Sequence, residues 1–276
     1  MIPTQHQKAE TFKALHSRSG IFVVPNPWDA GSARMLASLG FEALATTSAG
    51  LAYSLAKPDG EGVVTLDDTL ANCAAISAAV NLPVAADLEN GYADNPEGCA
   101  NAILLAAKAG VVGGSIEDAT GKADAPIYSF ELSVERIRAA VEAARSLPFP
   151  FMLTARAENL IHDVIDLKDT IKRLQAYAEA GADVLFAPGL KTAEDIATVV
   201  KAVSPKPLNV VMGLSGTGFS LNQLEDLGVK RVSLGSSLAR AAYGAFIDAA
   251  AEVSKKGTFT FANGIIRYAD LKTLLG

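Results

Sequence analysis

The feature that most restricts the fold is an eightfold alternation along the chain. Short apolar runs lie at residues 21–25, 42–46, 82–87, 112–118, 151–156, 183–188, 207–212 and 231–235, and longer Ala- and Leu-rich segments with helical spacing separate them. Nearly continuous apolar strands joined by crossover helices are typical of parallel strands buried on both faces. Eight such units in about 250 residues predict a (β/α)8 TIM barrel. No G-x-G-x-x-G motif follows the first strand, which disfavours a doubly wound sheet.

The length of 276 residues, half of them hydrophobic, fits one large core better than two. Residues 1–20 are predicted to form a helix that precedes the barrel, and no linker or low-complexity tract divides the rest. We therefore predict a single domain over residues 1–276. Cys73 and Cys99 lie in Ala-rich helical patterns, where a thiol acts as a small apolar side chain, so no disulfide is expected.

The charge pattern narrows the class of partner. The net charge is −6, from 24 basic and 30 acidic residues, and no basic run occurs, which argues against nucleic acid or an anionic membrane as a partner. The N-terminus lacks the apolar core of a signal peptide, and no apolar run is long enough to span a bilayer. We expect a cytoplasmic protein with a small-molecule ligand.

Carboxylates gather where the predicted strands end, which is the edge of a barrel that carries its chemistry. In "VAADLENGYADNPE", Asp87 and Glu89 are two residues apart and therefore lie on the same side of the chain. The other residues of this predicted rim are Asp59, Glu117, Asp118, Arg156 and Glu158. Such a cluster repels itself unless a cation is present, and Mg²⁺ accepts few direct carboxylate ligands and several waters.

Several ordered motifs resemble the isocitrate lyase and phosphoenolpyruvate mutase superfamily. They are "PNPWDAGSARMLASLGFEALATTSAG", "DLENGYADNP", "GGSIEDATG", "TARAENL" and "RVSLGSSLARAAYGAF". The resemblance implies a (β/α)8 barrel that binds Mg²⁺, with Mn²⁺ as an alternative, and a small 2-oxo acid or dicarboxylate. It also implies a homotetramer, a dimer of dimers in which paired subunits exchange a C-terminal helix.

The resemblance assigns roles to individual residues. The implied metal set has Asp87 as the direct ligand and three acids that hold the metal's waters, Asp59, Glu89 and Glu117. The implied substrate set is Thr47, Ser48, Ala49, Asp87, Arg156 and Asn209. Arg156 and Lys122 are the candidate catalytic residues. The bidentate fork of Arg156 suits a substrate carboxylate, although a structural ion pair with the acids is the alternative.

The loop "ATGKADAPIYSFE" (119–131) departs from the lyase pattern. Isocitrate and methylisocitrate lyases carry Lys-x-Cys-Gly-His here, and this loop has neither Cys nor His. Phosphonate-acting members place a lysine and an asparagine in it; Lys122 matches the first only, and "APGL" (187–190) lacks their His and Ser. Because Gly121 and Pro126 interrupt regular structure in a long connection, we predict a mobile lid.

The function favoured by these residues is Mg²⁺-dependent chemistry on a 2-oxo acid or its enolate, as a carbon–carbon lyase or decarboxylase other than isocitrate lyase. A phosphonate P–C mutase or hydrolase, a non-catalytic oxo-acid binder and a separate Mg²⁺-dependent aldolase stay open.

Other segments have plainer interpretations. The glycine-rich 213–220 segment is interpreted as a flexible turn, His162 as a surface or core residue, and Asp29 as a residue near a helix cap. In the last segment, an apolar helical stripe predicts an oligomer; its residues are Ile265, Ile266, Leu271, Leu274 and Leu275.

Overall fold

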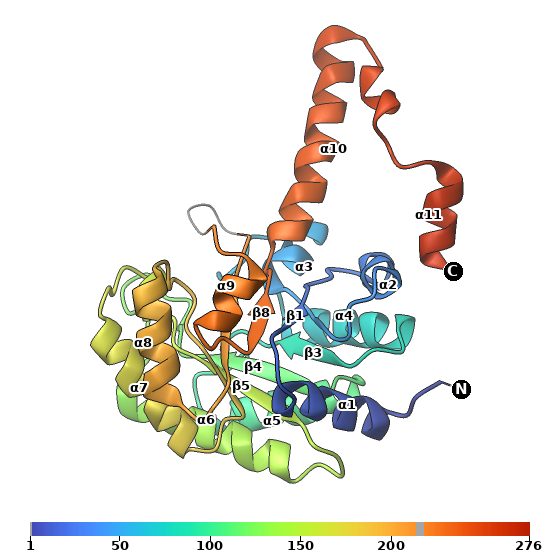
Figure 1. Ribbon diagram of the computed structural model, residues 1–276. Helices are drawn as coiled ribbons and strands as arrows, with labels where there is room; N and C mark the ends of the chain where they lie inside the picture. The colour runs from blue at the N-terminus through green and yellow to red at the C-terminus, as the bar shows by residue number, and fades with distance from the viewer. Residues whose placement is uncertain (1, 214–217) are drawn as a thin grey trace.

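The computed structural model describes residues 2–213 and 218–276 of the chain. Eight parallel strands follow one another in the order β1-β8-β7-β6-β5-β4-β3-β2. The backbone N–H of Ala45, at the end of β2, donates to Pro25 O after β1 at 3.1 Å, so the sheet curls back onto its first strand (Figure 1). The (β/α)8 barrel predicted from the alternation is therefore confirmed.

Every predicted strand is present, with shorter ends than the apolar runs. The strands are β1 Phe22–Val24, β2 Leu44–Ala45, β3 Val84–Asp87, β4 Gly113–Glu117, β5 Met152–Arg156, β6 Val184–Phe186, β7 Leu208–Val211 and β8 Arg231–Ser233. β2 is much shorter than its predicted range, because the chain leaves the ladder at Thr46 and turns into a helix two residues later. Residues 214–217 of the glycine-rich segment lie outside the described residues, so its interpretation as a turn stays a prediction.

Helices alternate with the strands, and α1 to α9 begin at side-chain caps. They are α1 Gln5–Ser17, α2 Ala30–Ser38, α3 Ser48–Ser54, α4 Leu66–Ala79, α5 Pro96–Lys108, α6 Phe130–Arg145, α7 Leu167–Glu179, α8 Ala193–Val203, α9 Leu221–Asp226, α10 Ser237–Lys256 and α11 Tyr268–Leu275, with the 3-10 turns η1 Asn159–Ile161 and η2 Thr260–Asn263. The carboxylate of Asp29 accepts from the Ser32 N–H, so Asp29 is the N-cap of α2.

The predicted leading helix, α1, closes the barrel at the end where the strands begin (Figure 1). Phe12 and Ala9 are fully buried there against apolar residues that open the strands, among them Val112 and Met152. A Cβ at Gly113 would lie 2.9 Å from the Phe12 ring. The glycine therefore lets the helix approach the strands closely, and the opposite end of the barrel is left for a site.

The C-terminal segment extends away from the barrel. In Figure 1, α10 projects outward and the chain then returns, so that α11 lies beside α2, where Arg34 Nη1 donates to Leu275 O at 2.8 Å. Phe246 in α10 is 68% exposed and Tyr268 at the start of α11 is 86% exposed. These elements thus leave a large apolar surface uncovered in the single chain. Among the residues described, no helix is both long enough and apolar enough to cross a membrane.

Candidate active site

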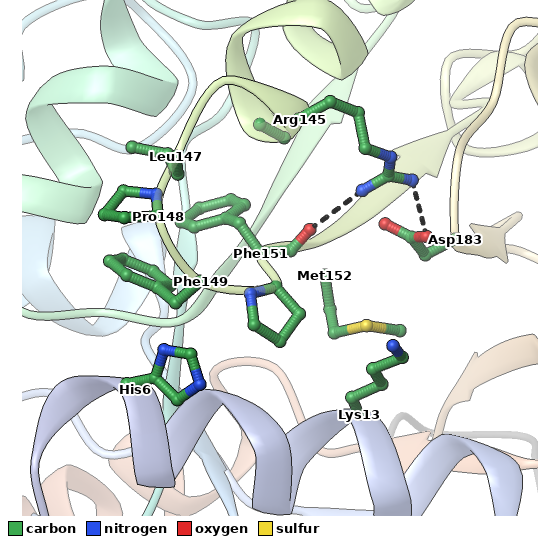
Figure 2. A pocket seen from close by; sticks show the side chains of 11 residues that line it. His6, Lys13, Arg145, Leu147, Pro148, Phe149, Phe151, Met152 and Asp183 are labelled. Carbon is green, nitrogen blue, oxygen red and sulfur yellow. Dashed lines mark hydrogen bonds and ion pairs between the residues drawn. The ribbon is translucent and has the colours of Figure 1, made fainter.

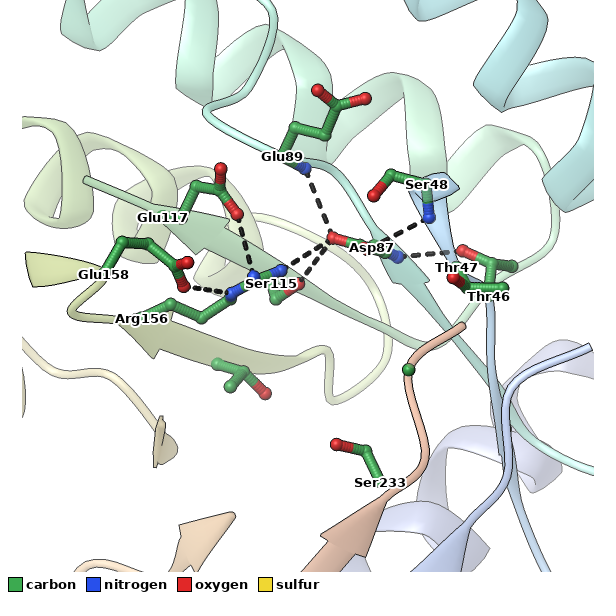
Figure 3. Close-up of polar contacts among 12 residues, drawn as sticks. Thr46, Thr47, Ser48, Asp87, Glu89, Ser115, Glu117, Arg156, Glu158 and Ser233 are labelled. Carbon is green, nitrogen blue, oxygen red and sulfur yellow. Dashed lines mark hydrogen bonds and ion pairs between the residues drawn. The ribbon is translucent and has the colours of Figure 1, made fainter. Parts of the chain in front are cut away.

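The carboxyl ends of β3, β4 and β5 bring the predicted rim residues together. Asp87, Glu117 and Arg156 are the last residues of these strands, and Glu117 is paired in register with Arg156. Because parallel strands end at one edge of the barrel, residues up to 69 positions apart in sequence reach hydrogen-bond distance. Figure 3 shows Asp87, Glu117 and Glu158 around the guanidinium of Arg156.

Each guanidinium nitrogen of Arg156 contacts a carboxylate. Nη1 lies 2.9 Å from Asp87, Nη2 lies 3.0 Å from Glu117, and Nε lies 2.7 Å from Glu158. The Phe186 ring lies 5.2 Å from the guanidinium carbon on one face. The structure therefore gives Arg156 the ion-pair arrangement that the sequence left as the alternative to substrate binding. One arginine against three carboxylates leaves an excess of negative charge.

We call the carboxyl ends of β3, β4 and β5 and the charged residues around them the mouth of the barrel. Four of its acids, Asp59, Glu89, Glu117 and Glu158, have raised pKa values. Burial raises the pKa of Glu117 well above its ordinary value although Arg156 opposes the rise, and burial raises the pKa of Glu158 in the same way. Burial together with the nearby Asp87 raises the pKa of Glu89 to about 7 and also raises that of Asp59. Burial is the largest cause of each shift, and the neighbouring carboxylates, which outnumber the compensating cations at the mouth, add to it.

Asp87 contacts residues from several elements of the mouth. Its carboxylate accepts from the backbone N–H of Ser48 at 3.1 Å and from that of Glu89 at 3.4 Å. Thr46 Oγ1 accepts from the Asp87 N–H at 2.9 Å, which fixes the end of β3 against the end of β2 (Figure 3). Thr47 is the N-cap of α3, so its hydroxyl is occupied by the Gly50 N–H at 3.3 Å. The predicted substrate residues of this loop thus lie beside the predicted metal ligand.

The arrangement of the acids fits a hard cation that keeps several of its waters. Within residues 2–213 and 218–276, no group of three or more His, Cys, Asp or Glu side chains lies close enough to hold an ion directly. Mg²⁺ commonly uses one or two carboxylates and keeps several waters, so a direct set of three is not required. The surplus of oxygen ligands and the raised pKa values of Glu89 and Asp59 are both features of a site that would accept a divalent cation.

Two cavities meet at this mouth. The inner cavity, of about 220 Å³, extends into the barrel and is lined by residues that include Asn26, Ala49, Asp87, Thr154, Arg156, Asn209, Arg231 and Ser233. The outer cavity, of about 720 Å³, is lined by residues that include Asp59, Glu89, Glu117, Lys122, Glu158 and His162. Because Ser48, Asp59 and Arg156 line both, the outer cavity opens onto the inner one at the acids.

A third groove, of about 540 Å³, lies at the other end of the barrel, between α1 and the segment that leads into β5. Figure 2 shows its apolar residues, including Pro148, Phe149 and Met152, with Arg145 paired to Asp183 at 2.7 Å. Its charged residues come from the beginnings of strands and from helix ends, where barrels place stabilising contacts rather than chemistry. The site is therefore assigned to the acidic mouth.

Lys122 lines the outer cavity and pairs with Asp94. Its Nζ lies 2.9 Å from Asp94, and both side chains are more than half exposed. Farther along the same loop, Tyr128 Oη donates to Asp94 at 2.5 Å, and the Arg136 guanidinium lies 4.0 Å from the Tyr128 ring centroid. The structure thus connects the predicted lid to the loop after β3, and a catalytic role for Lys122 stays a prediction.

Asp118 is a buried support that the sequence placed at the rim without a role. Its carboxylate accepts from the Glu158 N–H at 2.8 Å, from Arg173 at 3.1 Å and from Tyr177 Oη at 2.6 Å. It therefore joins β4, α7 and the residue that contacts Arg156 Nε. The sequence signal was the second acid in "IED", which follows Glu117 directly and must point the other way.

Asn26 is a further mouth residue that sequence reasoning missed. Its side-chain N–H donates to Thr46 O at 2.9 Å, and its oxygen accepts from the N–H groups of Leu234 and Gly235 at 2.8 and 2.9 Å. It thereby connects the carboxyl ends of β1, β2 and β8, where the barrel closes. A polar residue between two prolines after the first strand was the available signal.

Comparison with known proteins identifies the superfamily. The family model of phosphoenolpyruvate phosphomutase matches residues 12–254. A protein of Burkholderia cenocepacia J2315, described provisionally as a lyase/mutase, has a structure with a TM-score of 0.94 and 58% identity, over 98% of this chain and 95% of that one. The chain belongs to the phosphoenolpyruvate mutase and isocitrate lyase superfamily, which confirms the resemblance.

Two relatives have named activities. The 2-methylisocitrate lyase of Escherichia coli K12 is 32% identical over 66% of this chain and 62% of its own length. The oxaloacetate decarboxylase of Pseudomonas entomophila L48 is 29% identical over 83% of this chain and 78% of its own length. Each is similar to this chain, and both names describe cleavage of a carbon–carbon bond in a small carboxylic acid.

Proposed function

We propose that this protein is a divalent-metal-dependent enzyme that acts on a small 2-oxo acid and cleaves a carbon–carbon bond of the carbon next to the oxo carbon, so that an enolate forms. The observation that carries the proposal is the mouth itself, where Asp87, Glu117 and Glu158 contact one arginine at the entrance to a cavity of about 220 Å³. That volume is below the range of about 300–1,000 Å³ typical of drug-sized ligands, which supports a substrate of metabolite size.

In this proposal Asp87 holds the metal, and Asp59, Glu89 and Glu117 hold its waters. Mg²⁺, or Mn²⁺ in its place, would supply Lewis-acid stabilisation of negative charge on the substrate oxo group. Arg156 keeps the carboxylates in position through its ion pairs and presents its charge to the substrate. The Thr47–Ala49 segment lines the same cavity and would orient the substrate carboxylate, with Asn209 also in the lining.

Two forms of the reaction are compatible with these residues. In a decarboxylation, the bonding pair of the leaving carboxylate moves toward the oxo group, CO₂ departs, and the enolate then takes up one proton. In a retro-aldol cleavage, a base must first remove a hydroxyl proton. The loop 119–131 contains no Cys or His to serve as that base. Decarboxylation does not need such a base, so it is the form of the reaction that these residues favour.

The test is a substrate panel with Mg²⁺. Oxaloacetate, branched 2-hydroxy dicarboxylates and phosphonates would each be incubated with the protein and assayed for pyruvate, glyoxylate, CO₂ and phosphate, with EDTA as the control. We expect an organic product that EDTA abolishes. Release of phosphate would support the P–C alternative, and binding of oxalate without turnover of any compound would support a non-catalytic oxo-acid binder.

We also propose an assembly in which α10 and α11 contact other copies of the chain as a homotetramer. The uncovered apolar side chains of this segment, such as Phe246, Ile265 and Tyr268, support it. A monomer by light scattering at micromolar concentration would contradict it. A single domain and a cytoplasmic location remain part of the proposal.

A further inference from the structure

The inner end of the cavity holds a buried arginine whose polar contacts are neutral. Arg231 is the first residue of β8 and is 6% exposed. Its Nε donates to Asn209 Oδ1 at 2.8 Å, and its Nη2 donates to Thr154 Oγ1 at 2.9 Å. Its Nη1 lies 3.3 Å from His16 Nε2. Side chains from α1, β5 and β7 therefore hold the guanidinium in place at the inner cavity that it lines.

His16 accepts from Arg231 and does not neutralise it. His16 Nδ1 lies 2.8 Å from Phe12 O, which can only accept, so Nδ1 carries the proton and Nε2 presents its lone pair to Arg231. Burial and the charge of Arg231 lower the pKa of His16 to about 3, so the ring is neutral at physiological pH. The neighbours of Arg231 orient its charge without compensating it.

Arg231 has no carboxylate in ion-pair distance anywhere in the part of the chain that the structure describes. A guanidinium has five N–H donors, of which these contacts use three, so two stay available. A buried and uncompensated charge is costly, and proteins retain one mainly where a ligand or partner completes it. Since Arg231 lines the same cavity as Asp87 and Arg156, a ligand in that cavity can reach it.

We propose that Arg231 binds the second carboxylate of a short dicarboxylate substrate, whose oxo-carboxylate end lies at Asp87. This inference rests on the proposed function and adds to it the residue that would bind the second carboxylate, since the oxo end alone would require only the mouth. The outer end of the cavity has excess negative charge and accepts a metal chelate, whereas the inner end has excess positive charge and accepts an anion. A monocarboxylic oxo acid would leave Arg231 buried without a counter-charge.

The experiment compares two ligands that differ only in the second carboxylate. Lactate and malate share a 2-hydroxycarboxylate that can chelate Mg²⁺, and malate adds the distal group. Their dissociation constants would be measured by calorimetry with Mg²⁺ on the wild-type protein, on Arg231→Met and on Arg231→Lys. Arg145→Met, which removes an arginine paired with Asp183 at the opposite end of the barrel, is the matched control.

We expect wild type and Arg145→Met to prefer malate over lactate by about tenfold or more, as removal of a hydrogen-bonded charge pair typically costs. In Arg231→Met the preference should fall to within about twofold, and Arg231→Lys should keep part of it. An equal preference in Arg231→Met and wild type would overturn the inference, as would a wild type without preference.

Two further arms separate this inference from its rivals. Oxalate binding with Mg²⁺ tests the outer end alone: its absence in the wild-type protein would defeat the proposed function, whereas its retention in Arg231→Met shows that the mouth is intact. Chloride is the second arm. If chloride without metal stabilises the wild type and competes with malate, a resident inorganic anion occupies Arg231 and the dicarboxylate assignment is wrong.

Discussion

Arg156 and Arg231 line one cavity from opposite ends, and their surroundings differ in charge. Arg156 contacts three carboxylates, whereas Arg231 contacts an amide, a hydroxyl and an uncharged imidazole. Burial lowers the pKa of Arg156, but the surrounding acids outweigh it and raise that pKa well above the ordinary value, while burial alone lowers the pKa of Arg231 to about 9. The comparison shows that one residue type can have two roles in one cavity. Arg156 holds the acids in position, whereas Arg231 keeps donors available for an anion.

The largest effect should come from Asp87, because it is the proposed direct metal ligand at the outer end. Asp87→Asn should lower kcat/KM by about 10³-fold and abolish the thermal shift that Mg²⁺ plus oxalate produces. Asp226→Asn, at an exposed position at the end of α9, is the control. A normal Mg²⁺-dependent shift in the Asp87 variant would mean that the metal is held elsewhere.

The two arginines should also differ in their effect on folding. Arg156→Met leaves Asp87, Glu117 and the buried Glu158 without their counter-charge and should lower the free energy of unfolding by about 3–5 kcal/mol at pH 7. Arg231→Met loses hydrogen bonds but also removes an uncompensated charge, so its cost should stay below about 2 kcal/mol. Urea unfolding of the metal-free proteins measures both values. Equal losses of unfolding free energy in the two variants would contradict the proposed difference between the outer and inner ends of the cavity.

The excess of carboxylates at the mouth should make the free energy of unfolding of the metal-free protein depend on pH. Burial and Asp87 raise the pKa of Glu89 from 4.5 to about 7, so the folded state retains a proton that the unfolded chain loses. The contribution of this proton to the free energy of unfolding is about 1–3 kcal/mol. It is complete below about pH 4.5 and is lost as the pH rises through about 7. Urea unfolding across this range should show a smaller decline in Glu89→Gln and in the presence of Mg²⁺.

Glu142→Gln, at an exposed position in α6, is the matched control for that experiment and should decline with pH as the wild type does. If Glu89→Gln declines just as steeply, then Glu89 does not carry the excess proton and the other acids of the mouth must be examined.

The smallest effect on stability should come from the predicted lid, residues 119–131, at the outer cavity. The exposed Lys122–Asp94 pair contributes at most about 1 kcal/mol, so Asp94→Asn should hardly change unfolding. It should nevertheless speed tryptic cleavage after Lys122, because it weakens a contact between the lid and the loop after β3. Mg²⁺ with oxalate should slow that cleavage in the wild type, with cleavage after Lys255 as the internal reference. Equal rates under conditions of proven binding would show that the loop is no lid.

The sequence by itself was enough for the barrel and for the location of the acids. Apolar strands and helical segments are local patterns, so the eight strands could be found within a few residues of their observed positions. An acid that directly follows such a strand must lie at its carboxyl end, which placed Asp87 and Glu117 at one rim. The Asp29 cap followed from local pattern in the same way.

Only the tertiary structure decided which groups contact each of the two arginines, Arg156 and Arg231. The neighbours of Arg231 come from residues 16, 154 and 209, as many as 215 positions away along the chain, and an arginine at the start of an apolar strand gives no sign of them. Likewise, the three ion pairs of Arg156 depend on barrel curvature and on the Asp118 support beneath Glu158. Electrostatic energy depends on distance and burial, which sequence spacing does not define, so the assignment of one arginine to the acids and the other to a ligand required the folded chain.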